Sequence, residues 1–247
     1  MSLSEINLRE KEFHNKLQSQ KKSRFENIFY KALYNLYEDF NVCISEKAKR
    51  KTVLDYGCGS GTITQKIANS NPFRLNGIDI SEVSINKAID EAKKLNLQIE
   101  YTVDNCEKTK FKENTFDLIF GSGILHHLNL DKAVSEINRI LKIEGEMVFV
   151  EPLGTNPLIN FYRKLTPSSR SVDEHPFVEK DFKLINSLFK NVNIKYYGFF
   201  TLVFFLLYKN PENSLIFKIA SKLDDYFFKI KYFRNFAWSI LVIAKKN

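Results

Sequence analysis

The chain has 247 residues, a length that suits one domain or one domain with added segments. Hydrophobic residues make up 44% and charged residues 27%, while Gly (9) and Pro (6) are scarce, which excludes collagen-like and mainly disordered proteins. The formal net charge of +8 suggests an anionic neighbour such as nucleic acid, a membrane or an acidic substrate, or reflects solubility alone.

Cysteine usage and the distribution of apolar residues indicate a cytoplasmic protein. The three cysteines, none of them in a CxxC spacing, argue against a disulfide scaffold and a zinc ribbon. Residues 1–10 carry Glu5 and Glu10 and lack an apolar core, so we expect no signal peptide. The most apolar run, Phe199–Tyr208, is about half as long as the ~20 residues that a membrane-spanning helix needs. We therefore expect no transmembrane helix.

Along the chain, the predicted elements begin with a helical cap over residues 1–50, where apolar side chains from Phe25 to Tyr37 recur at spacings of three and four. In residues 51–152, short apolar runs alternate with helical patterns. The predicted strands are 53–54, 75–80, 99–103, 117–120 and 146–150, and the predicted helices are 62–70, 82–95 and 131–141. This alternation is typical of a doubly wound α/β protein with a mostly parallel sheet.

Residues 153–247 are assigned to the same domain, as a polar loop, the last two strands and an apolar helical insertion between them. Residues 193–200 and 238–244 are predicted to form a strand pair. A helix expected at 213–230 places an apolar set of side chains opposite a charged set. The apolar set is Ile216, Ile219, Leu223, Phe227 and Ile230, and the charged set is Lys218, Lys222, Asp225 and Lys229.

A glycine-rich turn follows the first predicted strand, in the run Asp55-Tyr56-Gly57-Cys58-Gly59-Ser60-Gly61. Glycines at alternate positions let a ligand lie against bare backbone at the carboxyl end of a strand. A dinucleotide-binding turn has its third glycine at the sixth position of the motif, which is Thr62 here. Asp55 suits a cationic group such as an ammonium. A plain strand-to-helix turn is the alternative.

Asp79 ends the second predicted strand, roughly twenty residues beyond the glycines, where a carboxylate accepts hydrogen bonds from a ribose diol. Ser81 is a candidate N-cap for the next helix, and a capping role for Asp79 itself is the alternative.

The turn from Asp55 to Gly61, together with Asp79, resembles the S-adenosylmethionine (SAM) site of class I methyltransferases. The resemblance covers residues 51–152. It includes Phe116–Phe120, which is similar to the family's fourth-strand motif, and Leu141–Glu146, which is similar to the turn before its fifth strand. It implies a Rossmann-like seven-stranded sheet, methyl transfer that converts SAM to S-adenosylhomocysteine, and no metal.

The resemblance also implies which residues contact the cofactor. Residues 102–111 are similar to the family's third loop, where an Asp accepts from the adenine amino group. The matching positions here are Asn105 and Cys106, and Asp104 is an alternative acceptor. The implied cofactor-binding residues are Asp55, Gly57, Cys58, Gly59, Gly61, Asp79, Ile80, Asn105, Cys106 and Ser122.

All four histidines are candidates for the acceptor side, and three of them are considered first. His126 and His127 follow the fourth strand, where the methyl group points in the resembling family. Because an imidazole takes up a proton near neutral pH, either one is a candidate base, and a structural hydrogen bond is the alternative. No acidic pair stands at ligand spacing beside them, so we expect no metal site. The run that contains His14 resembles an N-terminal element that folds over the cofactor in the family. The alternative is that His14 is a histidine on the surface of a helix.

Two further runs, Glu151-Pro152-Leu153-Gly154-Thr155-Asn156-Pro157 and Asp173-Glu174-His175-Pro176, resemble an E-P-x-G-x-N-P … D-E-H-P signature. This signature belongs to a bacterial subgroup of small-molecule or lipid-type methyltransferases. The resemblance makes Glu151 and His175 candidates to bind or deprotonate the acceptor. The alternative is a structural ion pair of Arg163 with Glu174 or Glu151.

The segment 199–234 stands where the resembling family has only a turn between its last two strands. Three alternatives stay open: a cap on an apolar acceptor pocket, peripheral contact with a membrane, or a dimer surface. The basic residues that favour the membrane alternative are Lys209, Lys218, Lys222, Lys229, Lys231 and Arg234. We accordingly expect a monomer or a homodimer, in the cytoplasm or on the inner face of the membrane.

Methyl transfer to a small, apolar or lipid-like acceptor is the favoured function, and two alternatives remain. An amino-adenine methyltransferase would carry D/N-P-P-Y/F after the fourth strand, where Gly121-Ser122-Gly123-Ile124 stands. A cytosine enzyme needs a Pro-Cys nucleophile, which Cys43, Cys58 and Cys106 all lack, so we expect no nucleic-acid partner. The other alternative is a non-catalytic SAM-binding or membrane-adaptor protein.

Overall fold

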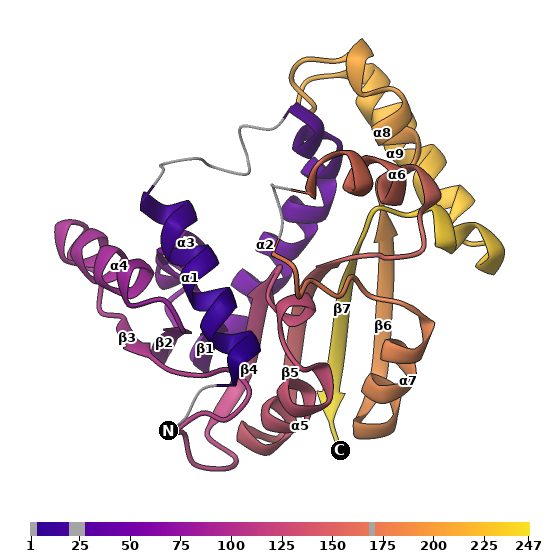
Figure 1. Cartoon of the computed structure of the whole chain (residues 1–247). Helices are drawn as coiled ribbons and strands as arrows, with labels where there is room; N and C mark the ends of the chain where they lie inside the picture. Colours follow the sequence, from indigo (N-terminus) through magenta and orange to yellow (C-terminus); the bar gives the residue numbers. More distant parts are fainter. Residues whose placement is uncertain (1–3, 20–27, 168–170) are drawn as a thin grey trace.

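The computed structural model describes residues 4–19, 28–167 and 171–247. In this part of the chain, seven strands form one sheet in the order β3-β2-β1-β4-β5-β7-β6 (Figure 1). β7 pairs antiparallel with β5 and β6, whereas the other neighbours pair parallel. The strands are β1 Thr52–Tyr56, β2 Arg74–Asp79, β3 Glu100–Val103, β4 Phe116–Ser122, β5 Leu141–Pro152, β6 Phe189–Tyr197 and β7 Ser239–Lys246. The predicted doubly wound, mostly parallel sheet is confirmed.

Helices cover both faces of this sheet (Figure 1). On one face, α2 inserts Leu36, Phe40 and Ile44, spaced four residues apart, into a core with Val53 of β1. On the other face, α5 packs over Leu54, the next residue of the same strand. The helices are α1 Glu5–Ser19, α2 Tyr34–Ala48, α3 Thr62–Ala68, α4 Glu82–Lys94, α5 Leu130–Ile140, α6 Pro157–Leu165, α7 Glu179–Leu188, α8 Phe200–Val203 and α9 Leu215–Phe227. Shorter 3₁₀ turns are η2 Ile28–Leu33, η3 Leu125–His127, η5 Phe205–Leu207 and η6 Lys231–Phe236.

The carboxyl ends of the parallel strands meet at one edge of the sheet, the upper edge in Figure 1. The glycine turn leaves β1 there, η3 follows β4, α6 follows β5, and α8 follows β6. In open α/β sheets, ligands bind at this edge, which gathers the chemistry-bearing segments of the sequence analysis in one place.

The sixth strand ends earlier than predicted, at Tyr197 instead of residue 200. Gly198 takes a positive φ of 85° and turns the chain away from the sheet. The buried carboxylate of Asp224 then accepts hydrogen bonds from the backbone N–H groups of Phe200 (2.6 Å) and Thr201 (3.4 Å). This side chain from α9 therefore caps the short helix α8, a role that no local pattern of the sequence announces.

The insertion helix forms as expected, and the side chains that it buries lie outside the apolar set named in the sequence analysis. Phe217 packs edge-on against Tyr34 of α2, with ring centroids 5.9 Å apart, and Asp224 turns inward to cap α8. Ile219 and Leu223 of that set, for which a pocket cap, a membrane contact and a dimer surface were all left open, are 52% and 42% exposed. The inward face is thus set by contacts with distant elements, which helical periodicity alone does not specify.

The phenylalanines of the insertion build a small aromatic core. The ring of Phe227 lies nearly parallel to Phe199 at 4.9 Å and to Phe233 at 4.1 Å. Much of the Phe-rich composition therefore serves local packing. Among the described residues, no helix combines the length and apolarity that crossing a bilayer requires.

Candidate functional site

The glycine turn after β1 presents bare backbone to open space. Gly57, Gly59 and Gly61 all have positive φ angles, of 77°, 53° and 79°. A Cβ atom added at Gly59 would have no heavy atom within 4 Å, whereas one at Gly57 would lie 2.4 Å from the side chain of Ile124. Gly57 is therefore required because a side chain there would collide with Ile124. Gly59 instead leaves the main chain open, as expected where a ligand lies against it.

Asp79, at the end of β2, joins this turn to the start of α4. Its Oδ2 accepts a hydrogen bond from the N–H of Gly59 at 2.9 Å, and its Oδ1 accepts from the N–H of Ser81 at 2.8 Å. The predicted N-cap is confirmed, because Ser81 Oγ accepts from the N–H of Ser84 at 3.1 Å. A carboxylate oxygen can accept more than one hydrogen bond, as contact with a ligand hydroxyl would require.

Asp55 lies beneath the turn and is only 3% exposed. Its Oδ2 accepts a hydrogen bond from the hydroxyl of Thr64 at 2.6 Å. Burial raises the pKa of Asp55 to about 7, with a further contribution from the charge of Asp79. A cationic ligand group nearby would favour the ionised carboxylate. Burial also raises the pKa of the Cys58 thiol well above its usual value, which makes this residue a poor nucleophile.

The third loop is held by its own polar side chains. Asp104 accepts from the backbone N–H groups of Asn105 (3.0 Å) and Lys110 (2.9 Å). The Asn105 carbonyl Oδ1 accepts from the N–H of Glu107 at 2.9 Å, and Cys106 is buried. Asp104 and Asn105, the two alternative adenine acceptors, thus both take part in shaping the loop.

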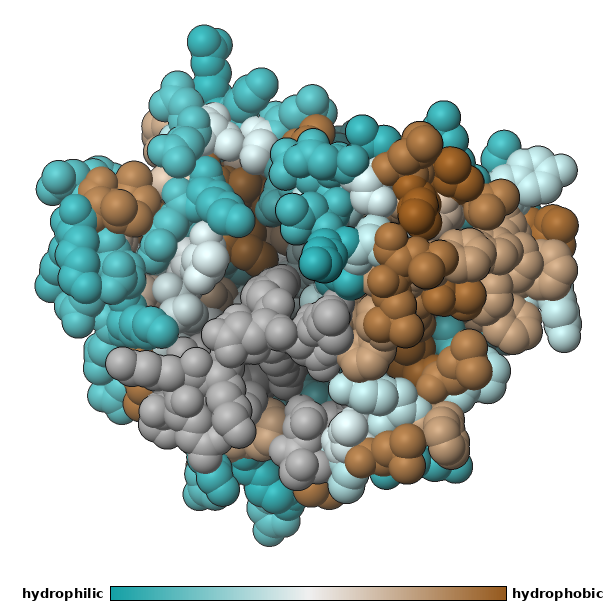
Figure 2. Space-filling model, turned by 90° about the horizontal axis from the view of Figure 1, so that it is seen from above, coloured by the Kyte–Doolittle hydropathy of each residue, from teal (hydrophilic) through white to brown (hydrophobic). Residues whose placement is uncertain are grey.

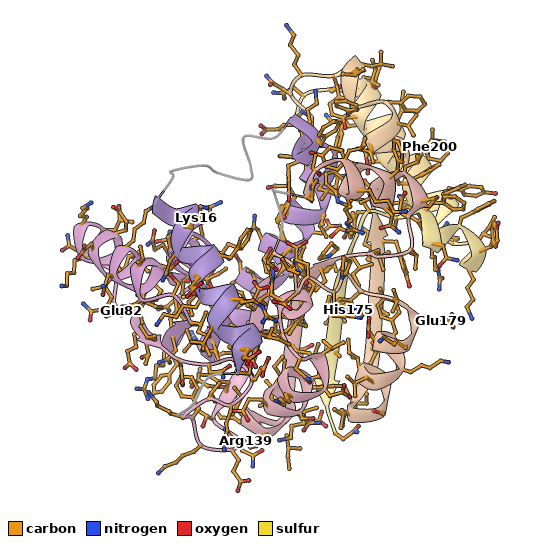
Figure 3. All side chains as sticks on the ribbon, viewed as in Figure 1. Lys16, Glu82, Arg139, His175, Glu179 and Phe200 are labelled. Atoms are coloured by element: carbon orange, nitrogen blue, oxygen red, sulfur yellow. The ribbon has the colours of Figure 1, made fainter. Side chains whose placement is uncertain are left out.

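Helix α1 lies across the upper edge of the sheet. Near one end, Asn7 Nδ2 donates to Glu107 of the third loop at 3.2 Å, and near the other, Asn15 accepts from Ser81 Oγ at 2.6 Å. Lys16 of this helix lies toward Glu82 of α4, far from Phe200 of the insertion (Figure 3). His14 belongs to α1, but its side chain lies outside the described residues. α1 therefore covers the edge that carries the glycine turn.

His126 and Glu151 form a buried pair at the ends of β4 and β5. His126 Nδ1 lies 2.6 Å from Glu151 Oε2. The same carboxylate accepts from the backbone N–H groups of Ile124 (3.1 Å) and Leu125 (2.8 Å), so it also caps η3. Glu151 is 0% exposed, and burial raises its pKa to about 7. When Nδ1 of His126 carries the hydrogen, Nε2 carries the lone pair that a base needs.

His127 lies between two carboxylates, Glu10, which was not a predicted site residue, and Glu174, which was predicted only as a partner of Arg163. Its Nδ1 lies 3.0 Å from Glu10 Oε2 of α1, and its Nε2 lies 3.8 Å from Glu174 Oε1. Ser171 also donates to Glu10, which is only 3% exposed. In the sequence, Glu10 is one of several charged residues of a polar N-terminal helix. Its burial, which marks it as special, is visible only in the structure.

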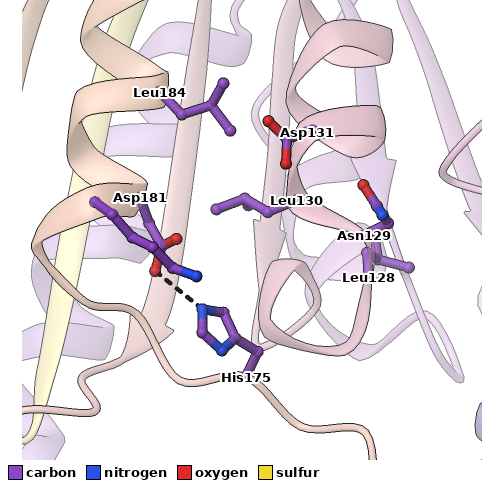
Figure 4. Close-up of a pocket in the computed structure, with 8 residues that line it drawn as sticks. Leu128, Asn129, Leu130, Asp131, His175, Asp181 and Leu184 are labelled. Carbon is purple, nitrogen blue, oxygen red and sulfur yellow. Dashed lines mark ion pairs between the residues drawn. The ribbon is translucent and has the colours of Figure 1, made fainter.

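His175 lies apart from the other histidines. Its backbone N–H donates to the carbonyl of His126 at 2.7 Å, but its side chain is 47% exposed and lies 3.4 Å from Asp181 of α7. It lines a separate cavity of about 300 Å³ between α5 and α7 (Figure 4).

The remaining predicted residues lie near the ends of the strands. Arg163 donates to the Leu153 carbonyl at 2.7 Å, which ties α6 to the segment after β5. Ile80 directly follows β2, and Ser122 is the last residue of β4.

Folding also brings together a possible metal-ligand set, which the sequence spacing did not predict. His126, His127 and Glu174 each place one ligand atom within 4.8 Å of the others. The carboxylate comes from the loop before α7, so only the fold brings it to the histidines. Two imidazoles and one carboxylate form a donor set for divalent transition metals. Methyl transfer from a sulfonium needs no metal, so we assign this set no part in the reaction.

The chain is similar to known methyltransferases in both sequence and structure. Residues 53–145 match the family described as "Methyltransferase domain". The structure of geranyl diphosphate C-methyltransferase from Streptomyces coelicolor A3(2) superposes with a TM-score of 0.70, covering 100% of both chains at 15% sequence identity. The chain has the class I methyltransferase fold. Within that fold, the glycine turn, Asp79 and the His126–Glu151 pair all lie at the carboxyl edge of the sheet.

Curated methyltransferases are also similar to this chain in sequence. The "Ubiquinone biosynthesis O-methyltransferase" of Pelagibacter ubique is 35% identical over 115 residues, which are 46% of this chain and 47% of that protein. The "Demethylmenaquinone methyltransferase" of Bacteroides fragilis is 33% identical over 103 residues, covering 40% of this chain and 42% of that protein. The matches thus span about half of the relatives' length or less.

Proposed function

We propose that the protein transfers a methyl group from SAM to a small, apolar or lipid-like acceptor. The observation that supports this most directly is the open backbone at Gly59 beside the Asp79 carboxylate, within the segment that matches methyltransferase domains. The bound cofactor would supply a sulfonium, which is an activated methyl donor. The protein's own tasks are then to bind, to orient, to exclude water and, where the acceptor needs it, to remove a proton.

The residues at the edge fit each part of such a cofactor. Gly59 lets the ligand lie against the main chain, and Asp79 accepts from the ribose hydroxyls. Asp55 is buried next to this turn, and its carboxylate would ionise when the ligand's ammonium group approaches. Asn105, with Asp104 beside it, stands where the adenine would lie. Ionisation of a buried acid by a cationic ligand adds attraction that bulk water would weaken.

His126 is the residue that we assign as general base. Its contact with Glu151 fixes the ring and directs the lone pair to Nε2, which can then take a proton from an acceptor hydroxyl, amine or carbon acid. Glu151 is fully buried and acts on the acceptor through this histidine. His127, held by Glu10, and His175, which faces another cavity, are assigned to positioning the surrounding loops.

The acceptor class rests on relatives and on surface character. The names of the curated relatives refer to ubiquinone and demethylmenaquinone, which are hydrophobic molecules. In this chain, the ligand edge adjoins α6, whose Phe161 and Leu165 are 64% and 65% exposed. An apolar surface beside the site favours an apolar acceptor over a charged polymer such as nucleic acid.

Transfer of a labelled methyl group tests this function. Purified protein is incubated with deuteromethyl-labelled SAM and a cell extract, which is then separated into organic-soluble, water-soluble and macromolecular fractions. We expect the label in an organic-soluble small molecule, and roughly tenfold less labelled product, or lower still, with Asp79→Ala at limiting SAM. The exposed-site variant Asp90→Ala serves as the control and keeps the product. Label in nucleic acid or protein, or in no fraction, would refute the proposal.

Helix α1 predicts a further kinetic effect. The Arg9 guanidinium donates to both carboxylate oxygens of Asp173 at 2.9 Å, which fastens α1 to the loop that carries Glu174. We expect Arg9→Ala to speed the dissociation of bound S-adenosylhomocysteine several-fold, because α1 covers its exit, while stability changes little since the pair is exposed.

Stopped-flow displacement of S-adenosylhomocysteine measures this rate. The matched control is Arg74→Ala, which removes an equally forked pair with Glu100 on β3, away from α1. Equal dissociation rates in Arg9→Ala and the control would contradict the cover role of α1.

A further inference from the structure

The insertion helix α9 carries two apolar faces. One face packs inward through Phe217, Ala220 and Phe228 near its C-terminal end. The other face points to solvent and is formed by large apolar side chains with exposed fractions from 41% to 72%. Its members are Leu215, Ile216, Ile219, Leu223 and Tyr226. Packing inside the protein explains the first face. The second face is left uncovered by the described part of the chain.

Neighbouring elements extend this exposed face. α6 exposes Leu158, Phe161 and Leu165 at spacings of three and four, and η5 exposes Leu206 and Leu207 at 75% and 62%. The two elements meet over one side chain, because the ring of Phe29 lies 5.4 Å from Tyr162 of α6 and 4.7 Å from Phe205 of η5. Seen from above the ligand edge, hydrophobic residues gather over α6, α8 and α9, while the opposite side is hydrophilic (Figure 2).

Basic side chains stand beside the apolar ones. On α9, Lys218 and Lys222 are exposed and lie on the helix sector next to the apolar face, at the spacing that places residues on one side of a helix. The neighbouring turns add exposed basic residues. They are Lys209, Lys229 and Lys231. Exposed acids of segment 199–234 are fewer, namely Glu212 and Asp225, so the surface is cationic.

We infer that this surface, formed by α6, η5 and α9, binds an anionic lipid bilayer. Apolar side chains at the centre would enter the headgroup–acyl boundary, while the lysines meet the anionic headgroups. A second copy of the chain fits less well, because a symmetric dimer would bring the same cationic residues of both copies together. The inference does not depend on the proposed function, although the surface adjoins the ligand edge and would hold that edge close to lipid.

Vesicle flotation tests the inference. We expect the protein to float with vesicles of phosphatidylglycerol and phosphatidylcholine, and to stay in solution with phosphatidylcholine alone or at high salt. The double variants Ile219→Ser/Leu223→Ser and Leu206→Ser/Leu207→Ser should each lose roughly tenfold in partitioning. The control Phe73→Ser removes an apolar residue that is even more exposed, just before β2 at the opposite edge of the sheet, and should float like the unaltered protein.

Sedimentation velocity and S-adenosylhomocysteine titration accompany the flotation. Unchanged cofactor affinity shows that the variants are folded, so a failure of membrane binding and a failure of the proposed function give different results. The inference is overturned when the unaltered protein never floats, when the α9 and η5 variants float as well as Phe73→Ser, or when the same variants dissolve a dimer instead.

Discussion

Replacement of Asp79 by alanine is expected to weaken the binding of S-adenosylhomocysteine by roughly tenfold to a hundredfold, the effect of losing hydrogen bonds to a charged group. Two losses act together. The ribose hydroxyls lose their acceptor, and the N–H groups of Gly59 and Ser81 lose the carboxylate that now holds them at 2.9 and 2.8 Å. The turn that must lie against the ligand would therefore also become less ordered.

Isothermal titration measures this affinity. Asp79→Asn separates the two losses, because an amide oxygen still accepts hydrogen bonds although the charge is gone. The affinity of this variant for S-adenosylhomocysteine should therefore lie between those of the unaltered protein and Asp79→Ala. Asp90→Ala, an exposed acid on the adjacent helix α4, is the matched control and should bind normally. Affinity of Asp79→Ala equal to that of the control would remove the ribose role of this carboxylate.

The sheet and the cofactor side were predictable because their signals are local. Buried parallel strands leave short apolar runs, and the run of β2 ends in Asp79, whose carboxylate holds the glycine turn. The glycines after β1 mark the turn, since positive φ angles favour residues without a side chain. The predicted order of strands and helices in residues 51–152 therefore agrees with the structure.

The acceptor side was less predictable because its contacts join distant parts of the chain. Glu10 meets His127 only after α1 folds over the sheet, and Asp173 meets Arg9 in the same way. Asp224 is similar: an acid within an amphipathic pattern is expected on the outside, yet here it caps α8 from within. Sequence patterns show which residues are apolar or charged. They do not show which carboxylate will accept a hydrogen bond from a backbone N–H group in a distant part of the chain.

Loss of the Glu151 carboxylate is expected to have the largest effect on stability. Glu151→Ala leaves buried N–H groups of η3 and the His126 ring without their acceptor, so the free energy of unfolding should fall by about 3 kcal/mol or more. Urea denaturation measures this change. Glu144→Ala is the matched control, because Glu144 is exposed and pairs only on the surface with Lys190 and Lys245, so its loss should matter little.

The dependence of stability on pH distinguishes the charge of Glu151 from its shape. Burial raises its pKa from 4.5 to about 7, so between these values the folded protein holds a proton that the unfolded chain has released. Stability should therefore fall as pH rises through this window and level off above it, with Glu151 contributing up to about 3 kcal/mol. Asp55, whose pKa is also raised to about 7, adds to the same slope. Glu151→Gln should retain the Asp55 part only, and an unchanged slope in this variant would show that Glu151 is ionised throughout, held so by its contacts with η3 and His126.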